Sequence, residues 1–241
     1  MEESPSFDEI WRRCAGQIRR GEGKVDIATG ETPNYSLVAR LGDDIGEVLH
    51  RTANAMGIAE QGHYVYPPGD IHFTILNLTP YLTAHQGDRD GSTCSAVTVA
   101  QGVLDDVFQT QRPFEFAVHG LNLFPTTIPA QLYPKDRKSI SRLRVTLARR
   151  LEAAGLVGSG VQKYEDELYW NICFANVVRF MKKASVEIVD RVAERRETEF
   201  GNVTLSEVEF VKTDKFLSER HTELIRLLSL RQPPTGEETV E

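Results

Sequence analysis

The sequence predicts a globular domain of the α/β or α+β class, made of two comparable halves. The chain of 241 residues has 40% hydrophobic and 26% charged residues, which are ordinary values for a globular protein. Amphipathic helical segments alternate with extended segments along the chain. The same strand-and-helix theme occurs in residues 35–110 and again in residues 111–212, although no direct sequence repeat relates them.

Helices are expected where apolar residues recur at spacings of three and four. The first such segment covers residues 7–20, and Asp43 or Asp44 is expected to cap the second helix. The other expected helices are residues 97–108, 140–154 and 186–195.

Strands are expected where β-branched and aromatic residues form short runs bounded by turn residues. The turn at residues 67–70 contains two prolines and a glycine and introduces a strand over residues 71–78. A polar loop is expected at residues 85–93, and residues 223–230 are compatible with either a strand or a helix. The other expected strands are residues 35–41, 114–123, 130–133, 168–180 and 203–211.

The composition limits the partners that we expect. The formal net charge is −7, whereas proteins that follow long nucleic acids usually carry a basic surface, because neutralising phosphates dominates that affinity. We therefore expect a small nucleotide or a short RNA end as ligand, and no long duplex. The sequence gives no information on protein partners.

The residue types also bear on the compartment and on cofactors. The chain has no run of about 18 apolar residues that would cross a bilayer, and its first residues lack the apolar stretch of a secretory signal. Cys14, Cys94 and Cys173 form no Cys-x-x-Cys pair, and the histidines do not fall at zinc-ligand spacings. We expect a soluble cytoplasmic protein without a membrane partner, metal or cofactor.

The segment with the clearest chemical signal is the strand that contains His72 and Thr74. Side chains alternate between the two faces of a strand, so these two side chains point the same way. An imidazole can transfer a proton near neutral pH, and a hydroxyl can hydrogen-bond a phosphoryl oxygen. A single His-x-Thr pattern is weak evidence by itself, because a half-exposed strand often carries such residues without function.

The context of this pair resembles the 2H (two-histidine) phosphoesterase superfamily, which includes the LigT-like RNA ligases and cyclic phosphodiesterases. Residues 66–75 resemble the first half-site of that superfamily. The similarity extends over roughly residues 35–230 and includes the segments 114–125, 143–155 and 200–212.

The resemblance implies an α+β fold of two duplicated lobes, whose antiparallel sheets face a central cleft and whose helices lie outside. The lobes would be residues 35–110 and 111–212, with a closing segment to residue 230. Residues 1–34 would form an extension of a helix and a loop, and residues 231–241 a disordered tail. Each lobe would supply one His-x-Thr/Ser pair, one histidine acting as base and the other as acid on a phosphodiester, without metal.

The second half-site departs from this pattern, because residues 169–180 contain no histidine. One register places Asn171 and Cys173 at the histidine and threonine positions, and it is favoured by alternation, because Ile172 and Phe174 then face the core. The other places Phe174 and Asn176 there and agrees with a trailing arginine, Arg179. In either register the second proton carrier is missing, since asparagine cannot act as a general acid near pH 7.

Other residues are candidates for the same site. Arg179 is a candidate phosphate ligand, and Tyr66 and Tyr133 are candidates for lining the cleft or stacking a base. His63 and His119 are the histidines considered as substitutes for the missing proton carrier, and a structural role is the simpler interpretation of each.

Two functions follow as hypotheses. The first is a metal-independent phosphodiesterase or cyclic phosphodiesterase that acts on a nucleotide or RNA-end phosphodiester, with His72 and Thr74 as catalytic residues. Asn171, Cys173, Asn176 and Arg179 would help to bind the phosphate. The alternative is a nucleotide- or phosphate-binding module of the same fold that has weakened or lost the chemistry. A scaffold without any ligand is a third possibility.

Overall fold

The computed structural model describes residues 6–25, 34–83, 92–136, 138–156, 172–214, 216–217 and 219–231. Within these residues, strands from both halves of the chain join in one antiparallel sheet of nine strands, and helices lie against it. The chain therefore has the predicted α+β architecture.

The described strands cover most of the segments that the sequence predicted as extended. They are β1 (Asn34–Arg40), β2 (Tyr64–Val65), β3 (His72–Asn77), β4 (Phe114–Leu121), β5 (Thr127–Pro134), β6 (Cys173–Arg179), β7 (Glu199–Leu205), β8 (Glu207–Thr213) and β9 (Glu223–Ser229).

The order of the strands places β3 and β6 side by side in the middle of the sheet. On one side of this junction the order continues through β5 and β4 to β7, and on the other side through β1 and β8 to β9. The short strand β2 pairs with β6 outside this order. The two strands that carry the predicted half-sites are therefore direct neighbours.

The described helices also match most of the expected segments. They are α1 (Phe7–Arg19), α2 (Asp43–Ala55), α3 (Thr79–Thr83), α4 (Ser92–Phe108), α5 (Ser139–Ala153) and α6 (Val186–Ala193), with 3₁₀ turns η1 (Pro68–Asp70) and η3 (Glu219–His221). The start of α1 is fixed by a capping box, in which Ser6 and Glu9 bond each other's backbone N–H groups through their side chains.

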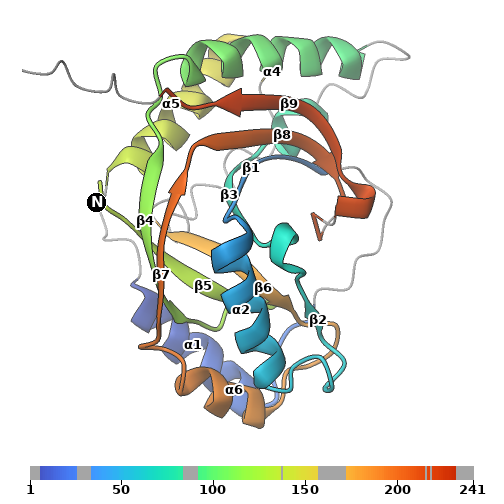
Figure 1. The fold of residues 1–241 in the computed structure, drawn as a ribbon. Helices are drawn as coiled ribbons and strands as arrows, with labels where there is room; N and C mark the ends of the chain where they lie inside the picture. The colour runs from blue at the N-terminus through green and yellow to red at the C-terminus, as the bar shows by residue number, and fades with distance from the viewer. Residues whose placement is uncertain are drawn as a thin grey trace, which may run out of the picture.

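Two pairs of helices lie at opposite ends of the molecule, with the sheet between them. Figure 1 shows α4 and α5 together at one end, next to β9, and α1 and α6 together at the other end. The helix α2 contacts β6 and β7 and also the turn η1. It therefore connects the second part of the sheet to the turn that precedes β3.

Residues 203–211 do not form the single strand that the sequence suggested. They contain the end of β7 and most of β8, which are separated at Ser206. Because β7 pairs with β4 while β8 pairs with β1 and β9, the chain crosses from one side of the sheet to the other at this residue. No glycine or proline marks this crossing in the sequence. Its position is determined by the strands with which β7 and β8 pair.

Other boundaries also differ from the prediction. The helix α4 begins at Ser92, so the end of the expected loop at residues 85–93 is helical. The N-cap of α2 is Gly42, whose φ of 82° and missing side chain exclude a side-chain cap. Asp43 and Asp44 instead occupy the first turn, where carboxylates stabilise the helix dipole.

The remaining differences concern segments that the sequence left open or missed. Residues 223–230, compatible with either a strand or a helix, contain the strand β9. The strand β2 and the short helix α3 were not expected. Residues 168–171 of the expected strand at 168–180 lie outside the described residues.

A buried arginine braces the junction in the middle of the sheet. Arg144 of α5 donates from Nε to the carbonyl of Ile75 at 2.8 Å and from Nη2 to that of Thr74 at 3.1 Å, both on β3. Its Nη1 donates to the carbonyl of Ile172, just before β6, at 3.2 Å. Its guanidinium carbon lies 5.4 Å from the centre of the Phe73 ring. One side chain thus holds β3 and the start of β6 together.

Among the described residues, no helix has the length and apolar character that a membrane span requires.

Candidate functional site

The first half-site begins at a turn that neighbouring elements hold in place. Gly46 of α2 lies so close to Pro68 that a Cβ at this position would overlap the Pro68 carbonyl group. Arg40, the last residue of β1, donates from Nη1 to the carbonyl of Gly69 at 3.0 Å. Its Nε donates to the carboxylate of Glu209 on β8 at 3.1 Å. The turn therefore presents the start of β3 in a fixed position.

His72 follows this turn and is only 1% exposed. Its Nδ1 lies 2.7 Å from the carbonyl oxygen of Asp70. A carbonyl can only accept, so Nδ1 must carry a proton and donate it. In the neutral ring the lone pair is then on Nε2, which has no hydrogen-bond partner within the described part of the chain. His72 thus offers one free acceptor atom.

A tyrosine and an arginine lie beside this imidazole. The ring centres of Tyr66 and His72 are 5.7 Å apart in an edge-to-face arrangement. Tyr66 is fully buried, and its hydroxyl oxygen accepts a hydrogen bond of 3.0 Å from Nε of Arg179. The ring of His50 on α2 donates to the Tyr66 carbonyl at 2.8 Å. The structure therefore brings His72 together with two other predicted site residues, Tyr66 and Arg179.

These surroundings keep His72 neutral. Its pKa is lowered from the ordinary value of 6.5 to about 4, chiefly because burial disfavours the charged imidazolium. The bond to the Asp70 carbonyl raises the pKa in part, while the positive charges of Arg40 and Arg179 lower it. At neutral pH this side chain can accept a proton or a hydrogen bond at Nε2, but it cannot donate from that atom.

The pairing of β3 with β6 determines which residues of the second half-site face His72. Phe73 and Ala175 are direct partners across the two antiparallel strands, so their side chains point to the same face. The neighbours of Ala175, Phe174 and Asn176, therefore point to the opposite face, as His72 and Thr74 do. This is the second of the two registers that the sequence allowed.

Phe174 occupies the position that a second histidine would need in this register. Its ring packs against that of Phe124, with ring centres 4.6 Å apart. Asn176 is buried, and its Oδ1 accepts a hydrogen bond of 3.1 Å from the hydroxyl of Thr127. The second half-site thus presents an aromatic pair and an amide, and neither can transfer a proton near neutral pH.

The two residues of the first register, Asn171 and Cys173, are not both placed by the structure. Cys173 lies on the same face of β6 as Ala175 and is buried, and burial raises the pKa of its thiol to about 11. A thiol with such a pKa is a weak nucleophile at neutral pH. Asn171 lies outside the described residues.

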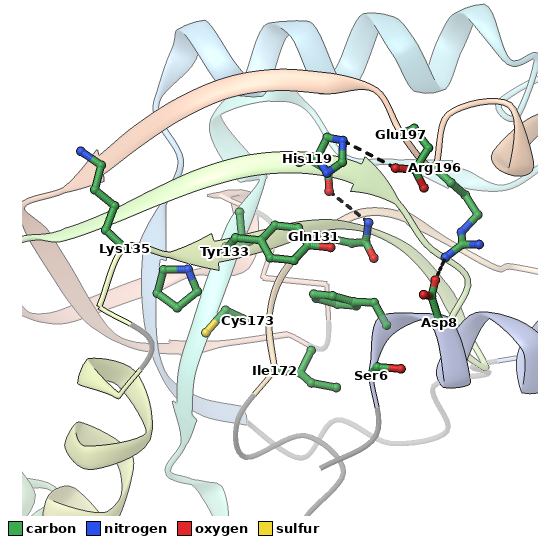
Figure 2. Close-up of a pocket in the computed structure, with 13 residues that line it drawn as sticks. Ser6, Asp8, His119, Gln131, Tyr133, Lys135, Ile172, Cys173, Arg196 and Glu197 are labelled. Carbon is green, nitrogen blue, oxygen red and sulfur yellow. Dashed lines mark hydrogen bonds and ion pairs between the residues drawn. The ribbon is translucent and has the colours of Figure 1, made fainter. Parts of the chain in front are cut away.

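A separate cavity of about 840 Å³ lies near the start of β6. Figure 2 shows Tyr133 and Cys173, two more of the predicted site residues, in its lining. His72, Thr74 and Asn176 are not part of this lining. The predicted site residues thus fall into two groups, one around His72 and one around Tyr133.

Arg40 is a residue near the site that sequence reasoning did not select, and His50 is another. Arg40 is the direct partner of His72 across β1 and β3. The only local signal is a single charged residue at the end of an otherwise apolar strand. Its role depends on Glu209, which is distant in sequence, so the pattern of the strand alone cannot reveal it.

In the described part of the chain, no three or more histidine, cysteine, aspartate or glutamate side chains group in a way that could hold a metal ion. The Asp70, Asp214 and His221 side chains instead line a second cavity, of about 670 Å³, beside Tyr64 and η3.

The sequence matches no family model, and no curated protein matches it. Solved structures match the fold. A Thermus thermophilus protein, TT0787, has a TM-score of 0.56 at 15% identity, covering 82% of this chain and 98% of that one. E. coli LigT in its apo form has a TM-score of 0.54 at 10% identity, covering 84% and 100%.

An Agrobacterium tumefaciens protein of unknown function also matches, with a TM-score of 0.52 at 12% identity over 82% of this chain and 86% of that one. Identities this low establish the fold and not the activity. The agreement covers most of this chain and 86% or more of each of these proteins. The chain has the α+β fold of E. coli LigT.

Proposed function

We propose that this protein binds a nucleotide or RNA-end phosphate on the His72 face of the sheet, and that it does not carry out two-histidine catalysis. The observation that carries this proposal is Phe174, which occupies the position of the second proton carrier. A 2H mechanism needs one group to take a proton and another to give one. A phenyl ring can do neither.

The groups that remain favour a particular ligand chemistry. The Nε2 of His72 is an acceptor without a partner among the described residues, and it suits a ribose hydroxyl better than a phosphate oxygen. The atom is buried, so a ligand reaches it only when neighbouring side chains such as Tyr66 move aside. The hydroxyl of Thr74, on the same face and partly exposed, can donate to a phosphate oxygen. A ligand with a hydroxyl next to a phosphate, such as a nucleoside 3′-phosphate, matches both. Solved structures of E. coli LigT with 3′-AMP, ATP and phosphate are consistent with a ligand of this class.

Calorimetric titration of the full chain with 3′-AMP, in the presence of a chelator, tests the proposal. We expect saturable binding, and about tenfold weaker binding of the 2′-deoxy analogue, because one hydrogen bond is lost. The same samples should produce no product from 2′,3′-cyclic AMP above background. Failure of every phosphate compound to bind would overturn the proposal.

A matched pair of variants locates the binding site. His72→Leu should weaken binding of 3′-AMP, because it removes the acceptor at Nε2. His63→Leu is the control: His63 is also buried and also has a pKa lowered by burial, but it packs against Phe180, just beyond the end of β6. Equal effects of the two substitutions would show that loss of stability, and not loss of a contact, explains the change.

The second candidate is the phosphodiesterase itself, with His72 and Thr74 as catalytic residues. The specific observation in its favour is the unprotonated Nε2, which is the atom a general base would use. Turnover of 2′,3′-cyclic AMP by the wild type and its loss in His72→Gln would establish this activity.

Restoring the missing side chains distinguishes the two candidates further. The double variant Phe174→His, Asn176→Thr rebuilds the second pair on the correct face. If only the second proton carrier is missing, metal-free turnover should rise by about 10²–10⁴ over the wild type. Phe174→Leu with Asn176→Thr is the control, since it repacks the same position without a proton carrier.

A further inference from the structure

The cavity in Figure 2 is a second feature with the dimensions of a ligand site. Its volume of about 840 Å³ is in the range of small-molecule pockets. It is formed by the first turn of α1, by β4 and β5, by the start of β6 and by the loop that follows α6. Chain segments that are distant in sequence thus converge on it.

Aromatic rings form one part of its wall. The ring centres of Phe7 and Tyr133 are 5.5 Å apart, and those of His119 and Tyr133 are 6.1 Å apart. Tyr133 is 41% exposed, so part of its ring is accessible to a ligand. The faces of such rings carry partial negative charge and attract cations.

The cations in the lining are already neutralised by other residues. Arg196 pairs with Asp8, and its guanidinium lies over the Trp11 ring at 4.8 Å. Lys135 pairs with Glu115, which is outside the cavity. The positive charge in the lining is therefore offset by these carboxylates.

The remaining charge in the lining is negative. The carboxylate of Glu197 is 84% exposed, and it lies 4.0 Å from Nε2 of His119. The pKa of Tyr133 is raised, first by burial and then by Asp8 and Glu197, with only Arg196 acting in the opposite direction. The start of α1 does not reverse this balance, because Asp8 and Glu9 lie in its first turn and offset the positive end of the helix dipole.

We propose that this cavity binds an organic cation, namely an alkylammonium or guanidinium group on an apolar stem. The cation lies against the Tyr133 and Phe7 rings and pairs with Glu197, while the stem contacts the apolar wall at Ile172 and Cys173. Gln131 pairs with Phe174, so Gln131 and Tyr133 lie on the same face of the sheet as His72, but His72 and Thr74 are not part of the lining of this cavity. The cation site also gives Tyr133 a role different from the phosphate contact that the sequence suggested.

Two sources supply this chemistry, a free polyamine-like molecule and an arginine or lysine side chain of a peptide. Agmatine, which has a guanidinium and an ammonium group on an apolar stem, is the probe for the first source. An N-acetyl-arginine amide peptide is the probe for the second. Calorimetry or amide chemical shifts of the full chain measure both.

Two substitutions and their matched controls define the expected result. Glu197→Gln should weaken agmatine binding at least about threefold, as expected for loss of an exposed ion pair, whereas Glu194→Gln, which removes the same charge three residues earlier outside the lining, should not. Tyr133→Leu should weaken binding about threefold through loss of the ring face, and Tyr133→Phe should retain it.

Several outcomes would overturn this inference. One is that neither cation binds at concentrations up to about 10 mM, which corresponds to a negligible affinity. Another is that Glu197→Gln binds agmatine as tightly as the wild type does. A third is that inorganic phosphate displaces agmatine at constant ionic strength. His72→Gln should leave agmatine binding unchanged. The cation site and the proposed phosphate site can therefore fail independently of each other.

Discussion

The buried His72 makes the stability of the protein depend on pH in a defined window. In the unfolded chain its imidazole takes up a proton near pH 6.5, whereas in the folded protein it does so only near pH 4. Between these values the unfolded state binds more protons than the folded state, so the free energy of unfolding falls as the pH falls. Above pH 6.5 this contribution is absent, and below about pH 4 it is constant.

The size of the effect follows from the same two values. Each pH unit within the window lowers the free energy of unfolding by at most about 1.4 kcal/mol for one such group. The whole window from pH 6.5 to about 4 therefore amounts to roughly 3 kcal/mol. A domain of ordinary stability, about 5–15 kcal/mol, would lose a substantial share of its stability.

Urea unfolding of the wild type and of His72→Gln, at several pH values between 7.5 and 4.5, measures this contribution. Protonation of carboxylates affects both proteins alike, so the difference between them isolates His72. His63 also has a pKa lowered by burial and, secondarily, by Lys182, and a His63→Gln background removes its part. We expect the wild type to lose more stability than His72→Gln as the pH falls. Parallel curves for the two proteins would refute the inference that His72 is excluded from solvent.

Three further predictions concern packing and reactivity. Gly120→Ala should lower the free energy of unfolding by more than about 2 kcal/mol, because φ is 78° there and a Cβ would overlap the Arg196 carbonyl. Gly102→Ala, with free space around the added Cβ, should raise the free energy of unfolding by about 0.5–1 kcal/mol. If urea unfolding gave the same change for Gly120→Ala and Gly102→Ala, this reasoning would be wrong. Arg144→Met should lower the free energy of unfolding by about 3 kcal/mol, because buried carbonyls lose their donor. A decrease of less than about 1 kcal/mol would indicate that water replaces the guanidinium as donor. Cys173 should resist alkylation in the native protein at pH 8, and rapid labelling detected by mass spectrometry would be inconsistent with its burial and raised pKa.

Much of the fold follows from local sequence signals. The capping box of Ser6 and Glu9 and the apolar spacing after it are sufficient for α1. The turn before His72 and the alternation after it are sufficient for β3 and for the common face of His72 and Thr74. These features depend on residues within a few positions of each other, so they can be predicted from a single sequence.

The parts that could not be predicted depend on contacts between distant residues. Alternation alone did not fix the register of the second half-site, because β6 is buried over most of its length and both faces carry apolar residues. The pairing of Phe73 with Ala175 resolves it. In the same way, the burial of His72 arises from Tyr66 and its bond to Arg179.

The continuous sheet also bears on how fast a ligand can bind. The strands β3 and β6 pair only at Phe73 and Ala175 among the described residues, and Arg144 bonds to carbonyls on both sides of this junction. Moving one side of the sheet against the other would break these Arg144 bonds, so Arg144 opposes an opening and closing motion. We expect ligand association in a single kinetic phase, with an observed rate that rises linearly with ligand concentration and no plateau from a closing step.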